Sequence, residues 1–435
     1  MPSPYPNPVI FVPGIMGSAL RDQYPVSPET VWSPFKLLIK DYERITAHPS
    51  DTRYELREPS RVVADQVFEL IYSELIEELR HNLSAKADEP VPVYPFAYDW
   101  RQPLENIEGK LAELIDEVID RTKLLRHYHD AGFGSERFPA QVNLVGHSMG
   151  GLIIAGCLQK NGQKRVNRVA TLASPFRGSL EAVAKTATGV AALGAATGSS
   201  REREAARVTP ALYYLLPSFK GAAESDPGLS SDLFLPETWQ PGVLRTLQEF
   251  IRLYGLDPVE PERQGLDLLK AMLDGAWRHR TRLERFQLPN PKSWLAIVGA
   301  NAKTRVRMHI NRDAAGELRF DLSDAEVRNE WENPNAGQRV FTGDNTVPYL
   351  GARCRFIPTE QVVCVTPEDF SFWEFKDRAL SSAGFHSAIP GMNLVQRLVV
   401  SHFKGGLYGD VWGRAVPDLE PGKPWDPPIA GLPRR

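Results

Sequence analysis

Short apolar runs alternate with helical patterns through the first part of the chain. The runs are mostly apolar, as expected of strands in a parallel sheet, although prolines break the one at 91–97 and suit the ends of a strand or an edge. They lie at residues 8–12, 91–97, 141–145 and 168–173. Between them, residues 70–83 and 105–124 carry apolar side chains at helical spacing; in the second, Ile107, Leu111 and Ile115 share one face. Because helices of this kind are the crossovers that parallel strands require, the pattern predicts an α/β fold with a mainly parallel sheet.

The pattern changes after residue 176 and later reverts. Residues 177–290 lack strand signals and are rich in Ala, Pro and charged side chains, which favours helices and turns. Strand patterns return at residues 293–301, 304–310, 317–322, 339–344 and 361–365, the second and third as a hairpin. We predict a core of residues 1–176 and 291–435, with residues 177–290 as a helical cap over the carboxyl edge of the sheet. The alternative is a separate helical domain. The tail beyond residue 405 is rich in Gly, Pro and Trp, and we expect it to be irregular.

Composition then narrows the function classes. The hydrophobic fraction of 42% and the charged fraction of 24% are those of an ordinary globular protein. A net charge of −3, with Lys and Arg spread along the chain, argues against a nucleic-acid-binding surface. No apolar run is long enough for a transmembrane segment, and the N-terminus lacks the regions of an export signal. We therefore expect a cytoplasmic protein.

The three cysteines give no sign of a metal or a disulfide framework. Cys157, Cys354 and Cys364 lack metal-ligand spacing, and an odd number cannot be fully paired. Cys354 and Cys364 could meet in one hairpin, but buried free thiols are the favoured interpretation. We expect neither a metal nor a cofactor.

Residues 141–158 carry the clearest chemical signal. An apolar strand pattern stops at Gly-His-Ser-Met-Gly and continues into a helical pattern, with Ser148 at the apex. A nucleophile elbow needs small residues such as Gly146 and Gly150, because the backbone at the serine is strained and its neighbours pack closely. The elbow also places Ser148 at a helix N-terminus, where amides favour a developing negative charge. A chance match to this short motif is the alternative, and the flanking strand and helix argue against it.

A serine hydroxyl needs a base and an acid, which in such folds follow it in the order acid, then histidine. Three of the nine histidines follow the predicted cap: His309 in a hairpin, His402 in a terminal helix, and His386 in a loop just before that helix. The loop position favours His386 as the base. The late candidates for the acid are Asp313, Asp321, Asp324, Asp344, Asp369 and Asp377. Asp344 ends a late strand in the turn TGDNTVP, so it is the favoured acid, although a turn aspartate often only forms the turn.

The tetrahedral intermediate needs two backbone N–H donors. One comes from the residue after the nucleophile, Met149, and the other from a loop after an early strand. The early Gly-rich turn that directly follows a core strand is PGIMGS, residues 13–18, so the second donor is Ile15 or Met16. A plain strand-ending turn is the alternative.

Five segments together resemble the lecithin:cholesterol acyltransferase-like family of α/β-hydrolases, which includes phospholipases and acyltransferases that use phospholipid donors. They are VIFVPGIMGSAL, YDWR at Tyr98–Arg101, GHSMGG, GDNTVP and FHSAIPG. The likeness spans residues 8–176 and 294–400, whereas in the cap only TPALYYLLP matches. It implies an α/β-hydrolase fold with a helical cap. It also implies Ser148, Asp344 and His386 as nucleophile, acid and base, and Met16 and Met149 as oxyanion donors.

Three further points qualify the resemblance. Trp32, in TVWSP, resembles a family tryptophan near the acyl site, with a core role as the alternative. The family turn reads Gly-Asp-Gly, whereas Asn345 follows Asp344 here; asparagine tolerates the same left-handed backbone. The lack of an export signal and of paired cysteines separates this chain from secreted members of the family.

These observations predict a serine hydrolase that cleaves carboxylic esters through an acyl-enzyme on Ser148. The apolar YYLLP segment of the cap suggests lipid or another bulky acyl group as substrate. We expect transient contact with lipid surfaces through the cap and no nucleic-acid partner. The alternatives are an acyltransferase that passes the acyl group to an alcohol, and a non-catalytic binding protein on a hydrolase scaffold.

Overall fold

The computed structural model describes most of the chain. The residues described are 5–33, 42–56, 59–189, 200–323, 343–370, 374, 384–405, 412–416 and 430–431. Part of the predicted strand at 339–344 and most of the tail beyond residue 405 lie outside these ranges.

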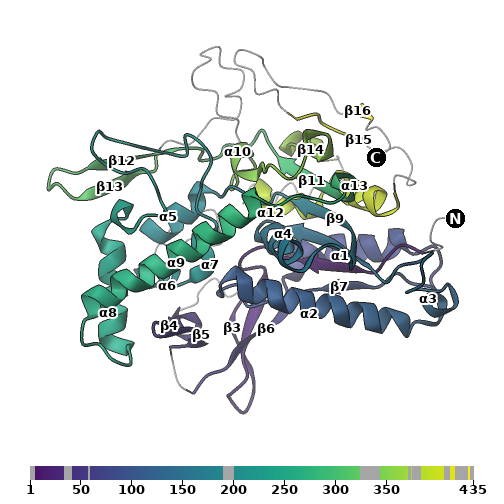
Figure 1. The fold of residues 1–435 in the computed structure, drawn as a ribbon, viewed down its shortest axis with the longest axis horizontal. Coiled ribbons are helices and arrows are strands. Elements are labelled where there is room, and N and C mark those ends of the chain that lie inside the picture. Colours follow the sequence, from purple (N-terminus) through teal and green to yellow (C-terminus); the bar gives the residue numbers. More distant parts are fainter. Residues whose placement is uncertain are drawn as a thin grey trace.

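A six-stranded, all-parallel sheet forms the centre of the molecule (Figure 1), in the order β14-β11-β9-β8-β1-β7. Its strands are β1 (Val9–Val12), β7 (Val93–Pro95), β8 (Val142–His147), β9 (Val166–Leu172), β11 (Trp294–Gly299) and β14 (Val362–Val365). Each of the six coincides with a predicted apolar run. Because all strands run the same way, their carboxyl ends meet at one edge, where α/β folds place their sites.

Helices cover both faces of the sheet, which explains why its strands are apolar on both sides. Ile10 and Val12 join the core cluster beneath α2 (Leu104–Lys123) and α4 (Met149–Asn161). Val9 and Phe11 join the opposite cluster, with α1 (Glu69–Leu83) and α13 (Asn393–Phe403). The predicted helices at 70–83 and 105–124 are thus confirmed within a residue or two at each end.

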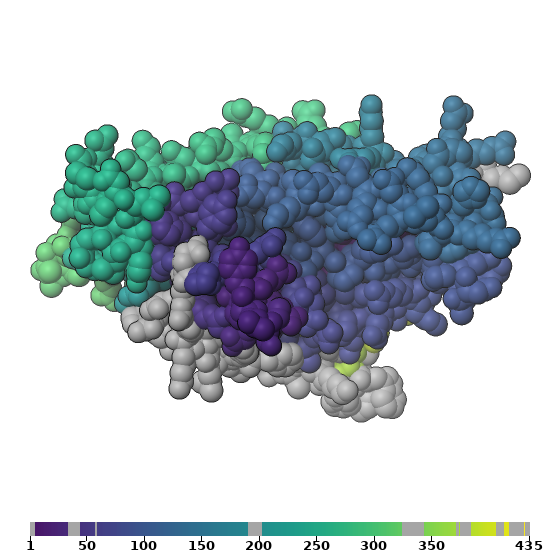
Figure 2. Space-filling view, turned by 90° about the horizontal axis from the view of Figure 1, so that it is seen from below, coloured from purple at the N-terminus to yellow at the C-terminus, as the bar shows by residue number. Residues whose placement is uncertain are grey.

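An antiparallel segment between β1 and α1 was not predicted. It contains a three-stranded sheet in the order β3-β2-β6, with a hairpin, β4-β5, beside it. The strands are β2 (Ser18–Asp22), β3 (Glu29–Trp32), β4 (Ala47–His48), β5 (Asp51–Glu55) and β6 (Val62–Val67). Seen from below, this purple segment lies between the teal cap helices and the blue core helices (Figure 2). A bond from the Leu256 amide to Ser50 Oγ joins the cap to the hairpin at 3.2 Å.

The inserted region is mainly helical, as predicted, with one exception. Its helices are α5 (Leu180–Thr188), α6 (Ser200–Arg207), α7 (Pro210–Tyr214), α8 (Pro241–Tyr254) and α9 (Pro261–Glu284). The short strand β10 (Ala223–Ser225) pairs with the hairpin β12 (Met308–Arg312) and β13 (Leu318–Asp321). That hairpin follows the predicted boundary at residue 290, so cap and core share a small sheet.

The remaining elements are short. They are the helices α3 (Arg126–Asp130), α10 (Tyr349–Ala352) and α12 (Phe385–Ala388), and the paired strands β15 (Trp412–Gly413) and β16 (Ala430–Gly431). Turns of 3-10 helix occur at Tyr42–Ile45, Pro236–Thr238, Pro291–Ser293, Thr359–Gln361, Pro367–Asp369 and Ile389–Gly391. Within the described ranges, none of the helices combines the length and apolar character needed to cross a bilayer.

Candidate active site

Ser148 lies at the turn between β8 and α4, at the carboxyl edge of the sheet. Its backbone has φ 53° and ψ −125°, a conformation that residues with a Cβ rarely adopt. The neighbouring glycines are required by close approach: a Cβ at Gly146 would lie 2.8 Å from the Gly150 carbonyl carbon, and one at Gly150 would lie 2.2 Å from the Val12 carbonyl oxygen. The strained turn and the close glycines are those of the predicted elbow.

The loop after β1 lies directly against this serine. A Cβ at Gly14 would be 2.9 Å from the Ser148 Cβ, so only a glycine lets the loop pass there. Met16 has φ 60°, a left-handed conformation that is uncommon for a residue with a side chain. Met149 is the first residue of α4, and its side chain is fully buried. The structure therefore brings Met16, Met149 and Ser148 to one edge of the sheet.

Residues of the YDWR segment hold both ends of this loop. Tyr98 Oη donates to the Pro13 carbonyl at 2.8 Å, and the Tyr98 amide donates to Ser18 Oγ at 3.2 Å. Trp100 Nε1 donates to the Ser18 carbonyl at 3.1 Å. The loop that carries the candidate oxyanion donor is thus tied at its first and last residues to a segment about 80 residues away.

Asp344 and His386 form a buried pair. His386 Nδ1 lies 2.7 Å from Asp344 Oδ2, and the other carboxylate oxygen accepts the amides of Thr346 (3.0 Å) and Val347 (2.6 Å). His386 is in the one-turn helix α12, where a loop was predicted. Ser148, Asp344 and His386 are each at most 5% exposed, so the bond between His386 and Asp344 acts where water screens weakly.

The turn at Asp344 is held by its own backbone and by Thr304. The Thr304 hydroxyl accepts the amides of Gly343 at 3.0 Å and Asn345 at 2.9 Å, and donates to the Ala302 carbonyl. Asn345 has φ 80°, which confirms the expectation that asparagine takes the left-handed position here. A Cβ at Gly299, the last residue of β11, would lie 2.4 Å from the Asp344 Cβ, so the turn packs against the end of that strand.

His386 lies against His147, the residue that precedes the candidate nucleophile Ser148. The rings of His147 and His386 are 4.9 Å apart, and His147 Nε2 is 3.1 Å from the His386 carbonyl oxygen. The two histidines that the chain order disfavoured lie elsewhere. His309 contacts Asp226 in the cap sheet, and His402 Nε2 lies 3.1 Å from the carbonyls of Val169 and Ser293.

Three side chains of this site were not predicted from the sequence: Tyr72, His147 and Thr304. Tyr72 Oη accepts the Gly14 amide at 3.2 Å and lies 3.0 Å from His147 Nδ1. Burial, together with the nearby His386, lowers the pKa of His147 well below its ordinary value, so its ring is neutral. Burial raises the pKa of Tyr72. The position of His147 inside GHSMG was a usable signal, whereas nothing local marks Tyr72 or Thr304.

Trp32 is buried at 5% exposure in β3, where its ring packs against Trp100 with centroids 5.0 Å apart. This contact fits the alternative of a core role. A part in substrate binding stays a prediction.

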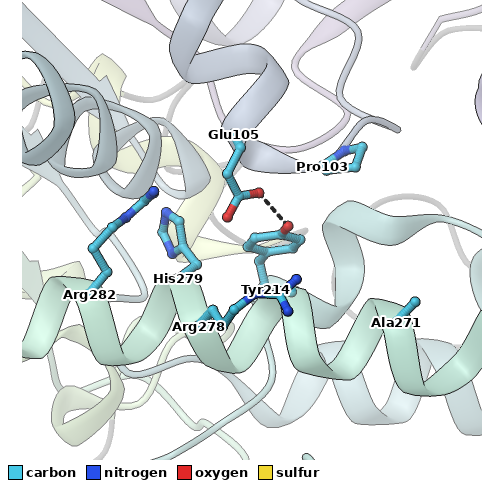
Figure 3. A pocket seen from close by; sticks show the side chains of 8 residues that line it. Pro103, Glu105, Tyr214, Ala271, Arg278, His279 and Arg282 are labelled. Carbon is cyan, nitrogen blue, oxygen red and sulfur yellow. Dashed lines mark hydrogen bonds between the residues drawn. The ribbon is translucent and has the colours of Figure 1, made fainter.

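A cavity of about 550 Å³ opens between α2 and α9, away from these residues. Figure 3 shows the Tyr214 ring above α9, with its hydroxyl 2.5 Å from Glu105. The cationic side chains that line it, Arg278 and Arg282, come from α9. Neither the candidate nucleophile nor its partners line this cavity. Over the described ranges, no group of three or more His, Cys, Asp or Glu side chains could hold a metal ion.

Comparisons with known proteins agree with this picture. Residues 60–237 match the family model described as lecithin:cholesterol acyltransferase. No curated protein matches the chain significantly, whereas 35 chains of solved structures do. A chain in the crystal structure of the Tle4–Tli4 complex is 15% identical, with 93% of this chain and 99% of that one covered and a TM-score of 0.56. The mature lipase BlEst2 of Bacillus licheniformis is 14% identical over 69% of each chain, with a TM-score of 0.28.

These comparisons support the fold and a broad class of activity. The identities are low, so the structural likeness speaks for the fold alone, which is the predicted α/β-hydrolase fold. The family match covers residues 60–237 and supports a lipid-acting hydrolase or acyltransferase. Through residues 60–237 this chain is similar to the lecithin:cholesterol acyltransferase family, as its sequence motifs predicted, and it has an α/β-hydrolase fold.

Proposed function

We propose that the protein cleaves carboxylic esters of lipids or other bulky acyl groups through an acyl-enzyme on Ser148. The observation that carries the proposal is the buried His386–Asp344 pair, 2.7 Å apart, next to a serine on a strained elbow. Because Nδ1 donates to the carboxylate, Nε2 of a neutral His386 is left unprotonated and can accept a proton. A serine, a free imidazole nitrogen and an orienting carboxylate are the parts that acyl transfer requires.

The reaction proceeds in two balanced halves. Ser148 Oγ attacks the acyl carbon while its proton passes to His386 Nε2, and the carbonyl electron pair moves onto the oxygen. The amides of Met16 and Met149 stabilise this oxyanion. Collapse breaks the ester C–O bond, and His386 returns the proton to the leaving alcohol. Water then repeats the sequence on the acyl-enzyme and releases the acid.

Contacts between the cap and the loop at residues 13–18, the oxyanion loop, support a large acyl group as substrate. Ala184, Ala206 and Leu212, from α5, α6 and α7, form an apolar cluster against which Ile15 packs. The cap thus presents apolar surface directly beside the candidate donor loop. The YYLLP segment is fully packed in the core instead: Tyr213 Oη donates to the Arg207 carbonyl and Tyr214 Oη to Glu105.

The test is covalent labelling combined with hydrolysis. A fluorophosphonate should label the wild type, and Ser148→Ala should abolish labelling and lower kcat on p-nitrophenyl esters by roughly 10⁴-fold or more. Ser174→Ala is the matched control, since Ser174 is a buried serine just after the next strand, β9, and its hydroxyl has no partner among the described residues. Wild-type labelling and activity in Ser148→Ala would reject the mechanism. A wild type that shows neither labelling nor hydrolysis would instead favour a binding protein.

Substrate class needs a separate measurement. We expect kcat/KM to rise from acetyl to long-chain esters, because each additional buried methylene contributes about 0.8 kcal/mol. Equal values across chain lengths would reject the lipid part of the proposal and leave the esterase part intact.

Acyl transfer is a second candidate, favoured by the family match at residues 60–237. It uses the same acyl-enzyme and hands it to an alcohol rather than to water. Product analysis with and without an added long-chain alcohol separates the two, because only a transferase forms the new ester in large excess over the free acid.

A further inference from the structure

Tyr72 links helix α1 to the oxyanion loop. Its side chain is 2% exposed, and its ring packs on Phe11 of β1 with centroids 4.8 Å apart. The Gly14 amide lies 3.2 Å from Tyr72 Oη, and a Cβ at Gly17 would lie 3.1 Å from the same oxygen. An amide can only donate, so Tyr72 Oη accepts this bond and keeps its own proton for another partner.

That partner is His147, and both of its ring nitrogens are used. Tyr72 Oη lies 3.0 Å from Nδ1, and Nε2 lies 3.1 Å from the His386 carbonyl oxygen. A carbonyl can only accept, so Nε2 carries the proton and Nδ1 of the neutral ring accepts from Tyr72. The constraints at the two ends, an amide and a carbonyl, therefore require the same tautomer of His147.

The result is a continuous series of hydrogen bonds in one direction. It runs from the Gly14 amide through Tyr72 and His147 to the backbone of His386. The side chain of His386 continues it to Asp344. One end lies two residues before Met16, the proposed donor, and the other end is the proposed base. The series includes His147, the residue directly before Ser148.

We propose that Tyr72 and His147 are positioning residues that hold the oxyanion loop and His386 in fixed relation around Ser148. This inference rests on the proposed function of that serine. Acyl transfer requires the donor and the base to be placed to within a fraction of an ångström, because a 1 Å error can cost about a hundredfold in rate. A buried, fully bonded tyrosine and histidine supply such a fixed link.

A packing role for the same side chains would give a different result. If Tyr72 and His147 only filled space, losing their polar atoms would lower stability and leave the turnover of the folded enzyme unchanged. The kinetic constants of folded variants therefore separate the two roles.

The first experiment removes one oxygen atom. Tyr72→Phe keeps the ring and its packing on Phe11 but breaks both bonds of Oη. We expect kcat on a p-nitrophenyl ester and the rate of fluorophosphonate labelling to fall by about 10- to 100-fold, with KM within about threefold. Tyr128→Phe is the matched control: Tyr128 is also fully buried and donates one bond, 2.7 Å to the Pro6 carbonyl, far from the site. It should lower the melting temperature but leave kcat unchanged.

A second pair of variants separates the two bonds of His147. A glutamine amide reaches the position of Nε2–H, whereas an asparagine oxygen reaches that of Nδ1. His147→Gln therefore keeps the bond to the His386 carbonyl, and His147→Asn keeps the one to Tyr72. We expect each to retain part of the activity that His147→Ala loses. These variants also serve if Tyr72→Phe does not fold.

The outcomes distinguish this inference from the proposed function. Wild-type kcat and labelling rate in folded Tyr72→Phe would overturn the positioning role, and so would equal activities of the Gln, Asn and Ala variants at residue 147. Neither result tests whether Ser148 is the nucleophile. Activity that survives Ser148→Ala would instead overturn the proposed function itself.

Discussion

At the residue scale, the site depends on a few residues with a strained backbone conformation or an unusual protonation state, both of which cost free energy. Ser148, Met16 and Asn345 all have positive φ, which costs of order 1–3 kcal/mol at residues other than glycine. Such strain persists only where the surroundings hold it, and here close glycines and buried hydrogen bonds do so. The neutral His147, buried between Tyr72 and His386, is another such state, because water would favour its protonation at acidic pH.

The lowered pKa of His147 predicts a specific loss of stability in acid. In the unfolded chain this histidine takes up a proton near pH 6.5, whereas the folded state holds it neutral to much lower pH. The unfolded state therefore binds more protons below pH 6.5. The contribution of His147 to the free energy of unfolding should fall there by up to about 1.4 kcal/mol per pH unit. The facing groups that titrate are Tyr72 and His386.

The measurement compares the wild type with His147→Gln. The difference in their unfolding free energies by urea should be constant above pH 6.5 and shift in favour of the variant below it. A difference that stays constant down to pH 5 would mean that His147 is protonated in the fold.

At the element scale, the YDWR segment is a support for the oxyanion loop. Arg101 is buried against Asp99 and Glu55, with bonds of 2.8 Å to each carboxylate. This buried cluster holds Tyr98 and Trp100 where they reach Pro13 and Ser18. A segment that carried the family resemblance in the sequence therefore supports the backbone of another segment.

Trp100→Phe tests that support. It removes the donor to the Ser18 carbonyl and keeps most of the ring, so we expect about 1–3 kcal/mol of destabilisation and a fall in kcat. Trp294→Phe is the control, since Trp294 is equally buried and loses one bond of the same kind, to Thr171 Oγ1. A similar fall in kcat for both variants would mean that the effect is general rather than specific to the loop.

At the scale of the whole molecule, the cap is tied to the core by buried polar contacts. Arg280 of α9 is 2% exposed and donates to the carbonyls of Phe176, Tyr214 and Leu216. Glu108 of α2 is fully buried and accepts from Arg282, with His279 Nε2 2.9 Å away. The strand β10 of the cap also pairs with a hairpin beyond it. These contacts predict that cap and core unfold together.

Calorimetry of Arg280→Met checks this prediction. The variant leaves three buried carbonyls without their donor, so we expect a loss of about 3 kcal/mol or more in a single transition. Arg252→Met, on the exposed face of α8, should change stability by less than about 0.5 kcal/mol. Two separate transitions, with the mutation shifting only one, would show that residues 177–290 are an independent domain.

Much of the fold could be predicted because its signals are local. The six central strands are apolar runs, and α1 and α2 are periodic, since burial on both faces or on one face leaves a direct mark in the sequence. The antiparallel segment was missed because its strands bury polar residues: Ser18 and Asp22 are almost inaccessible, and their partners Tyr98, Ser60 and Arg61 lie far along the chain. The position of His386 in a one-turn helix was also beyond local pattern.

The same division applies to the site. Chain order and turn chemistry pointed to Ser148, Asp344 and His386. The fold brings Asp344 against the end of β11 and His386 against His147. The roles of Tyr72 and Thr304, and the bonds of His147, emerged only from the tertiary structure, since these bonds join residues 58, 75, 239 and 39 positions apart. The sequence by itself determined which residues are the candidates for the chemistry. Only the fold decided what holds these residues in place. A hydrogen bond between two segments far apart in the chain leaves no periodic pattern in the sequence of either segment.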